Sequence, residues 1–211
     1  MILSRTAEKI ALTMTRKLRV LSLQQIAEGW CSGNISNARM QAEALIKFGF
    51  LEQYDELVGP RLETDHPLFV WTPNDTSTPN FEKLAYQCKN RWGQEARKET
   101  LFFATRDANN ALAGFNSGKS PPSFSVRHDL QVAQVFISHM ENRGSEWKRW
   151  QGEDQLKFDG YCRGKTAIPD AAIRSRKQRY DDIVIEIGGQ YAAKRLEEFH
   201  IDYQTCKYEI W

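Results

Sequence analysis

Two acidic residues near the end of the chain have the type and spacing of a divalent-metal site. Asp170 directly follows Pro169, and Glu186 lies near the end of an apolar run. The apolar and β-branched residues around them predict two neighbouring strands, over 166–174 and 182–187. Because residues on one face of adjacent strands line up across a sheet, we expect the two carboxylates to meet at its edge.

Such a pair would suit Mg²⁺ or Mn²⁺. Both are hard cations that prefer carboxylate, carbonyl and water oxygens, so Asp170, Glu186 and the backbone carbonyl of Ile187 would supply part of the coordination shell. Water and a phosphate oxygen would complete it. An ion held in this way polarises a phosphodiester and lowers the pKa of a bound water.

Three other side chains are candidates for the same site, each with an alternative role. Glu153 could be a further ligand or part of a solvated loop. His128 could touch the site or DNA, although an ordinary histidine near a helix N-terminus is the simpler interpretation. Tyr191 is expected to serve packing, but a tyrosine there could also be a nucleophile for strand transfer.

The elements predicted around these residues follow the order αβββαβ. Apolar residues at helical spacing indicate the helices, and short apolar runs between turn residues indicate the strands. The predicted elements are a helix over 128–142, strands over 146–150, 166–174 and 182–187, a helix over 190–204 and a strand over 207–211.

The first 72 residues predict three helices and a β-hairpin. Apolar residues from Ala7 to Leu18 recur at helical spacing, Ser22 is a suitable N-cap for a second helix, and a third begins near Ser36 and ends before Gly49. Two apolar runs then predict a hairpin with a long tip, with strands over 50–54 and 67–71.

Three helices followed by a hairpin resemble the winged helix-turn-helix family, whose third helix enters the major groove of DNA. The polar residues that would remain exposed on that helix are Asn37, Arg39, Gln41 and Lys47. Because many winged helices bind proteins instead, a protein–protein role is the alternative.

Charge is nearly balanced overall, with 29 Lys and Arg against 27 Asp and Glu, so any nucleic-acid surface must be local. Basic residues exceed acids over 4–20, where Glu8 is the single acid, and over 163–179, where Asp170 is the single acid. Lys and Arg make most phosphate contacts, so Arg174 and Arg176 are candidates for binding DNA. A solvated surface is the alternative.

Other sequence features bound the class of protein. No apolar run approaches the roughly 18 residues of a membrane-spanning helix, and the charged start is unlike a signal peptide, so we expect a cytoplasmic protein without membrane insertion. Pro-containing polar stretches at 72–80 and 116–125 predict boundaries. The expected α+β organisation is a winged helix over 1–72, a linker and connecting helix over 73–125, and a nuclease-like domain over 126–211.

The acidic pair resembles the PD…(D/E)xK motif of the restriction-endonuclease-like family, with Pro169-Asp170 as its first part and Glu186 as the second acid. Gly188 stands where that motif has Lys, and Lys194 in the following helix is the nearest replacement. A lysine displaced onto that helix is a variation that the family tolerates.

The whole chain resembles the replication-relaxation family, and more narrowly the MobC-type relaxases of mobilizable bacterial plasmids. The segments that carry this resemblance are HDLQV, a later Glu, IPDAAI and IVIEIGGQYAAKRLEEF. It implies metal-dependent nicking of one DNA strand at a plasmid transfer origin. The implied partners are a conjugative coupling protein and other relaxosome components.

Two other functions fit the same residues. A winged-helix regulator or replication accessory protein with an inactive nuclease-like core is favoured by Gly188 in place of Lys. An ordinary double-strand endonuclease would share the site and differ in its product.

Overall fold

A computed structural model describes residues 2–59, 66–92 and 96–211 as a mixed α+β structure. Its contacts divide the chain into two compact units, each built from two separate stretches of sequence. Unit 1 comprises Met1–Arg61 and Glu95–Gly144, and unit 2 comprises Leu62–Gln94 and Ser145–Trp211. The boundaries predicted at 72 and 125 therefore differ from those of the compact units.

The N-terminal helices of unit 1 begin at side-chain caps. Ser4 accepts a hydrogen bond from the backbone of Ala7, Ser22 forms a capping box with Gln25, and Asn34 caps the third helix. The predicted helices and the Ser22 cap are thus confirmed. Their bounds are Arg5–Arg16 for α1, Leu23–Trp30 for α2 and Ile35–Lys47 for α3.

The sheet of unit 1 has the order β1-β4-β2, with antiparallel pairing throughout. Its strands are β1 (Leu21–Ser22), β2 (Leu51–Val58) and β4 (Arg97–Ala104). The predicted hairpin between 50–54 and 67–71 is wrong, because β2 pairs along its whole length with β4. The apolar end of β4, residues 101–104, is buried. Strand β4 is also longer than the segment 67–71 that was predicted to pair with β2.

Helices α5 (Arg106–Leu112) and α6 (Ser123–Asn142) complete the described part of unit 1. The predicted helix over 128–142 is present but begins earlier and belongs to this unit. Val126 and Leu130 of α6 pack in a buried cluster that contains residues of β2 and β4. The helix is also tied to α2, because the Gln25 side chain donates a hydrogen bond of 2.8 Å to the Leu130 carbonyl.

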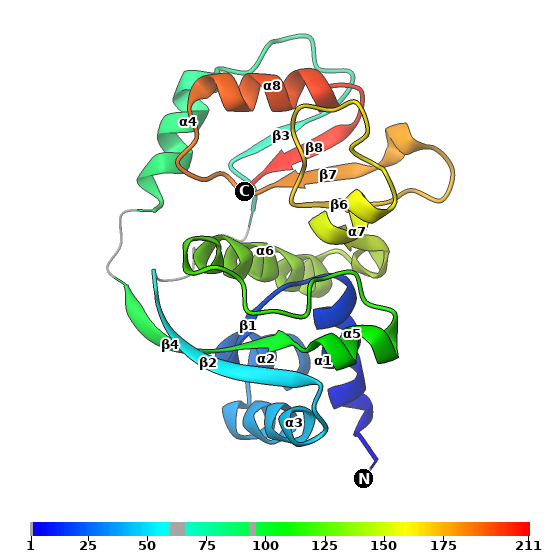
Figure 1. Cartoon of the computed structure of the whole chain (residues 1–211). Coiled ribbons are helices and arrows are strands. Elements are labelled where there is room, and N and C mark those ends of the chain that lie inside the picture. The colour runs from blue at the N-terminus through cyan, green and yellow to red at the C-terminus, as the bar shows by residue number, and fades with distance from the viewer. Residues whose placement is uncertain (1, 60–65, 93–95) are drawn as a thin grey trace. The chain divides into compact units, whose positions relative to one another are not determined.

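The sheet of unit 2 has the order β3-β8-β7-β6-β5 (Figure 1). Strands β5, β6 and β7 are successively antiparallel, and β8 runs parallel to β7 after the crossover helix α8. The predicted order of strands, helix and strand is present, although much of the segment 146–150 is 3₁₀-helical. The bounds are Phe69–Trp71 for β3, Trp150–Gly152 for β5, Ala171–Ile173 for β6, Ile183–Glu186 for β7, Ala193–Tyr203 for α8 and Lys207–Ile210 for β8.

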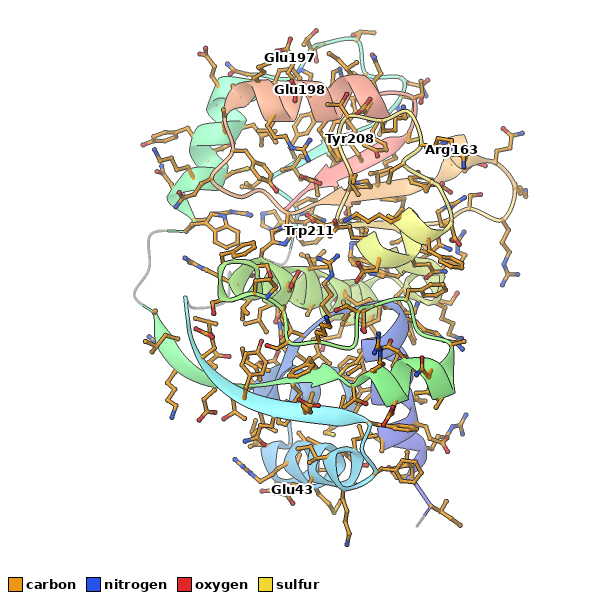
Figure 2. All side chains as sticks on the ribbon, viewed as in Figure 1. Glu43, Arg163, Glu197, Glu198, Tyr208 and Trp211 are labelled. Carbon is orange, nitrogen blue, oxygen red and sulfur yellow. The ribbon has the colours of Figure 1, made fainter. Side chains whose placement is uncertain are left out.

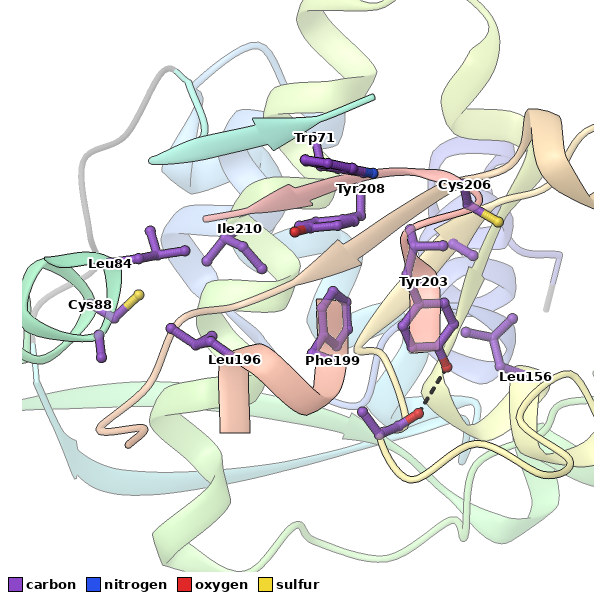
Figure 3. Close-up of a cluster of buried hydrophobic side chains, with 14 of the residues drawn as sticks. Trp71, Leu84, Cys88, Leu156, Leu196, Phe199, Tyr203, Cys206, Tyr208 and Ile210 are labelled. Atoms are coloured by element: carbon purple, nitrogen blue, oxygen red, sulfur yellow. Dashed lines mark hydrogen bonds between the residues drawn. The ribbon is translucent and has the colours of Figure 1, made fainter. Parts of the chain in front are cut away.

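The core of unit 2 is rich in aromatic side chains. Trp71 of β3 stacks on Tyr208 of β8, and Phe199 of α8 meets Tyr208 edge to face (Figure 3). The Tyr203 hydroxyl donates a hydrogen bond of 2.8 Å to the Ala167 carbonyl. Helix α4 (Phe81–Asn90) adds Leu84, Ala85 and Cys88 to this core. The segment predicted as a linker and connecting helix thus contains a helix that contributes core residues.

Within the described residues, no helix combines the length and apolar character needed to cross a membrane.

A fragment of residues 126–211 is expected not to fold cooperatively. It lacks β3 and α4, so the apolar surface that Trp71, Leu84 and Cys88 cover would face water. Thermal melts followed by circular dichroism, with the full chain as control, test this. A sharp two-state transition in the fragment would show that the core is complete without these elements.

Candidate functional site

Asp170 and Glu186 come together at one end of the unit 2 sheet. Ala171 of β6 pairs with Ile185 of β7, and the next residues toward that end are Asp170 and Glu186. Because opposed residues of antiparallel strands share a face, continuing this register places both carboxyl groups on one side. That side also carries Val184, which packs in the core formed with α8.

Both carboxyl groups are buried, and that of Asp170 is hydrogen-bonded to the backbone. Asp170 is 9% exposed and Glu186 is 2% exposed. One oxygen of Asp170 accepts a hydrogen bond of 2.7 Å from the backbone N–H of Ile187. This bond ties the residue before β6 to the residue after β7, so Asp170 holds the chain that carries Glu186.

Tyr191 closes the same site. Its hydroxyl lies near the Glu186 side chain, whose charge acts on it. Burial raises the pKa of this hydroxyl strongly, and the charges of Glu186 and Asp170 raise it further, against a smaller opposing effect of Arg195. The phenol therefore keeps its proton at neutral pH. This favours the packing interpretation of Tyr191 over a nucleophilic one, which needs an activated oxygen.

Neighbouring atoms leave no room for a side chain at Gly188, the position where the motif has lysine. A Cβ atom added at Gly188 would lie 2.2 Å from the Sγ atom of Cys88 and 3.1 Å from the Trp211 carbonyl oxygen. The Gly188 carbonyl accepts a hydrogen bond of 2.6 Å from the Trp92 indole. Helix α4 and the residues after it thus occupy the space that a side chain at 188 would need.

Cys88 is a neighbour of the acidic pair that sequence reasoning missed. Burial raises the pKa of its thiol to about 11, Arg91 opposes this, and the charge of Glu186 adds to it. The signal in the sequence was weak, because Cys88 lies almost a hundred residues before Glu186 and shares no motif with it. It is a buried, protonated thiol that serves packing.

Lys194 does not take the place of the missing lysine. Its side chain is 83% exposed and lies 4.0 Å from Glu198, one turn further along α8. Figure 2 labels Glu198 on this helix. The next residue, Arg195, is the cation whose charge acts on Tyr191. The predicted role of Lys194 at the acidic pair is therefore not supported by its position.

Glu153 directly follows β5, the strand that pairs with β6. Gly152, the last residue of β5, pairs with Ala171, so Glu153 follows at the same end of the sheet as Asp170. It begins α7 (Glu153–Phe158) and forms an ion pair with Lys157 in that helix. Among the described residues, no group of three or more His, Cys, Asp and Glu is arranged to hold a metal ion.

His128 belongs to unit 1 and not to the unit that carries the acidic pair. Its Nδ1 atom lies 3.8 Å from a carboxylate oxygen of Asp129, its neighbour in α6. This fits the structural interpretation of His128 better than a role at the acidic pair.

The donor types fit a hard divalent cation. Asp170 and Glu186 offer carboxylate oxygens, and Ile187, the residue after Glu186, has a backbone carbonyl. Mg²⁺ is commonly bound through one or two carboxylates, with water and phosphate oxygens completing its octahedron. The two acids and the carbonyl thus match this chemistry, whereas the nitrogen and sulfur ligands that zinc favours are not among them.

The exposed face of α3 is narrower than predicted. Gln41 is buried; it accepts a hydrogen bond of 2.5 Å from the Ser4 hydroxyl and donates one of 3.0 Å to the Asn37 side chain. Gln41 is therefore turned toward partners within the protein, while Asn37 is half-buried and its DNA contact stays a prediction. Arg39 and Lys47 are exposed, as is the acidic Glu43, labelled in Figure 2.

The two arginines proposed for DNA contact have different surroundings. Arg174 forms an ion pair of 2.9 Å with the fully buried Asp182 and donates a hydrogen bond to Gln151. Arg174 thus has structural partners, and its role in binding DNA stays a prediction. Arg176 is exposed on the loop between β6 and β7.

Comparisons with known protein families, curated proteins and solved structures give no significant match to this chain.

Replacing Gly188 with alanine is expected to lower the free energy of unfolding by about 1–3 kcal/mol, because the new methyl group overpacks against Cys88. Urea denaturation measures the loss. Adding Cys88→Ala should make the double variant more stable than the sum of the single losses predicts. Gly189→Ala is the control, since its Cβ would meet Tyr191 at a looser 3.2 Å. Strict additivity would contradict the contact.

Proposed function

We propose that this protein binds DNA and cleaves one strand with a Mg²⁺ or Mn²⁺ ion held by Asp170 and Glu186. The observation that carries the proposal is that Asp170, the residue before β6, accepts a hydrogen bond from the backbone of Ile187, the residue after Glu186, at one end of the antiparallel pair of β6 and β7. The Asp170 bond to the Ile187 backbone keeps the two chain segments in register.

The protein groups would act by holding and orienting. Asp170 and Glu186 would bind the ion, with the Ile187 carbonyl as a further oxygen. When bound, the ion would polarise the scissile phosphodiester and make a nearby water more acidic. The Tyr191 hydroxyl lies near Glu186, so this ring would pack beside the ion-binding carboxylate.

The arrangement of unit 1 supports the DNA-binding part of the proposal. Helices α1 to α3 precede the long antiparallel pair of β2 and β4, as in a winged helix whose wing strands are separated in sequence. In this fold the third helix enters the major groove. Arg39 and Lys47 on α3 are the side chains that would contact phosphates there.

A narrower form of the proposal rests on the sequence resemblance alone. It is nicking at a plasmid transfer origin in the bacterial cytoplasm, in a relaxosome that includes a conjugative coupling protein.

Asp170→Asn and Glu186→Gln should each reduce nicking of supercoiled origin plasmid in Mn²⁺ to background. Each amide has the shape of the acid, and the amide oxygen that replaces an Asp170 carboxylate oxygen can still accept the Ile187 hydrogen bond. The fold should therefore persist while the charge that binds the ion is lost. Glu197→Gln, at an exposed glutamate of α8, is the matched control. Nicking at the wild-type rate in either site variant would rule out this mechanism, and linear product from the wild type would indicate a double-strand endonuclease.

Arg39→Ala and Lys47→Ala should each weaken duplex binding and reduce the magnitude of the log–log salt slope by about 0.9. The reason is that each lost phosphate contact releases one fewer set of condensed counterions. Fluorescence anisotropy at several salt concentrations measures the slope. Gln41→Ala is the control, because that buried amide should affect stability and not the slope. Unchanged slopes in both arginine and lysine variants would show that α3 does not contact DNA.

A second function is favoured by a specific observation, the packing of Cys88 against Gly188 where the motif has lysine. In this alternative the protein is a DNA-binding regulator or replication accessory protein whose acidic pair serves structure alone. Calorimetric titration with Mn²⁺ separates the two functions. Binding that disappears in Asp170→Asn supports the nuclease, and the absence of any heat of binding in the wild type supports the regulator.

A further inference from the structure

Unit 2 has a surface cavity of about 580 Å³ that Asp170 and Glu186 do not line. It lies between the loop that joins β3 to α4 and the C-terminal end of α8, two segments that can be followed in Figure 1. Trp71 and several polar side chains line it, among them Asp75, His200, Gln204 and three threonines. A cavity of this size with a few polar groups is typical of small-molecule sites.

Hydrogen bonds fix both sides of the cavity. The Trp71 indole N–H donates a bond of 2.9 Å to the Gln204 carbonyl, which joins β3 to the end of α8. In the loop, the Asp75 carboxylate accepts a bond of 2.8 Å from the backbone N–H of Thr72, and the Asp75 N–H donates one of 2.9 Å to the Thr72 carbonyl. Because the walls are held in this way, a ligand need not order them on binding.

A buried histidine lines the cavity. His200 is 9% exposed, and its Nδ1 atom lies 2.9 Å from the Tyr208 hydroxyl. Burial lowers the pKa of His200, so its imidazole is neutral at pH 7. Burial also raises the pKa of the Tyr208 hydroxyl, and the nearby charge of Asp75 raises it further. Among the described residues no hydrogen-bond partner reaches Nε2, so this is the ring nitrogen that His200 can offer to a ligand.

The lining is rich in hydrogen-bond acceptors and carries a negative charge. The second carboxylate oxygen of Asp75 has no partner among the described residues. The Gln204 amide nitrogen donates to the Ile201 carbonyl at 3.4 Å, which leaves its amide oxygen as an acceptor. With the imidazole proton on Nδ1, the Nε2 atom of His200 is an acceptor as well. None of the described residues that line the cavity is Lys or Arg, so its charge favours a cation over an anion.

We propose that this cavity binds a small primary amine, whose ammonium group is held by the Asp75 carboxylate and the Nε2 atom of His200. An ammonium group donates three hydrogen bonds and accepts none, so it matches a lining of acceptors. Hydrogen bonds from a charged donor to a carboxylate are also stronger than those between neutral groups. A neutral polyol of the same size would gain nothing from the charge of Asp75. The inference is independent of DNA cleavage.

Titration of the ¹⁵N-labelled full chain, followed by NMR at neutral pH and constant ionic strength, tests the site and its preference. The probes have four carbons each and differ in charge: 1,4-diaminobutane, 1,4-butanediol and succinate. Diaminobutane should move the Trp71 indole N–H and His200 Nε2 resonances, and it should bind at least about fivefold more tightly than butanediol. Succinate should not bind. The ring resonances of His139, which is buried in unit 1, are the internal control.

Asp75→Asn tests the carboxylate. The amide oxygen can still accept the bond from the Thr72 backbone, so the loop should keep its shape while the charge is lost. Diaminobutane binding should weaken about fivefold, as expected for an ion pair that is partly exposed to water. Asp181→Asn is the matched control, because Asp181 is an exposed aspartate of unit 2 that does not line the cavity. Thermal melts confirm that each variant is folded.

Each outcome supports or overturns the amine site. A selective response to diaminobutane that weakens in Asp75→Asn and not in Asp181→Asn supports it. Equal affinity for diaminobutane and butanediol, or unchanged affinity in Asp75→Asn, would show that the cavity does not recognise an ammonium group. Titration with diaminobutane that leaves the Trp71 and His200 resonances in place would refute the site altogether. Nicking by Asp75→Asn should match the wild type, so the two proposals can fail separately.

Discussion

The candidate site depends on two carboxyl groups held side by side in the interior of unit 2. Burial of a carboxylate costs free energy unless hydrogen bonds or a cation stabilise it, and an apolar pair of similar volume is often the more stable choice. Here the Asp170 carboxylate accepts a hydrogen bond from the backbone N–H of Ile187, and Glu186 lies near the Tyr191 hydroxyl. This arrangement is costly for stability alone, which is why we infer a role in binding a cation.

The residues around Asp170 and Glu186 limit the chemistry that this pair could perform. The close approach of Cys88 to Gly188 requires a residue without a side chain at 188. Lys194 lies in solvent beside Glu198. Any cleavage by this site would therefore proceed without the lysine that the endonuclease-like motif contains. A non-catalytic protein would show the same packing of Cys88 against Gly188. A measurement of metal binding therefore distinguishes the two functions more directly than the structure of the site does.

The chain passes between the two units more than once. After β2 it contributes β3 and α4 to unit 2, and it then returns as β4 to pair with β2. Each unit thus needs sequence from both sides of a segment that belongs to the other. In unit 2, the aromatic core that includes Trp71 supports the same sheet whose end carries Asp170 and Glu186. The site at Asp170 and Glu186 therefore requires that β3 and α4 fold onto the core of unit 2.

Local patterns in the sequence determined the helices α1 to α3, the Ser22 cap and the order of strands and helix from β5 to β8, because apolar spacing and capping act over a few residues. They also pointed to Asp170 and Glu186, since neighbouring strands of a meander align their residues. Only the tertiary structure decided that β4, not β3, pairs with β2, that α6 packs in unit 1, and that Cys88 fills the space beside Gly188. Those outcomes depend on contacts between residues far apart in the chain. Several segments are similarly apolar, so the sequence alone does not show which of them pair; the fit of whole packed surfaces decides it.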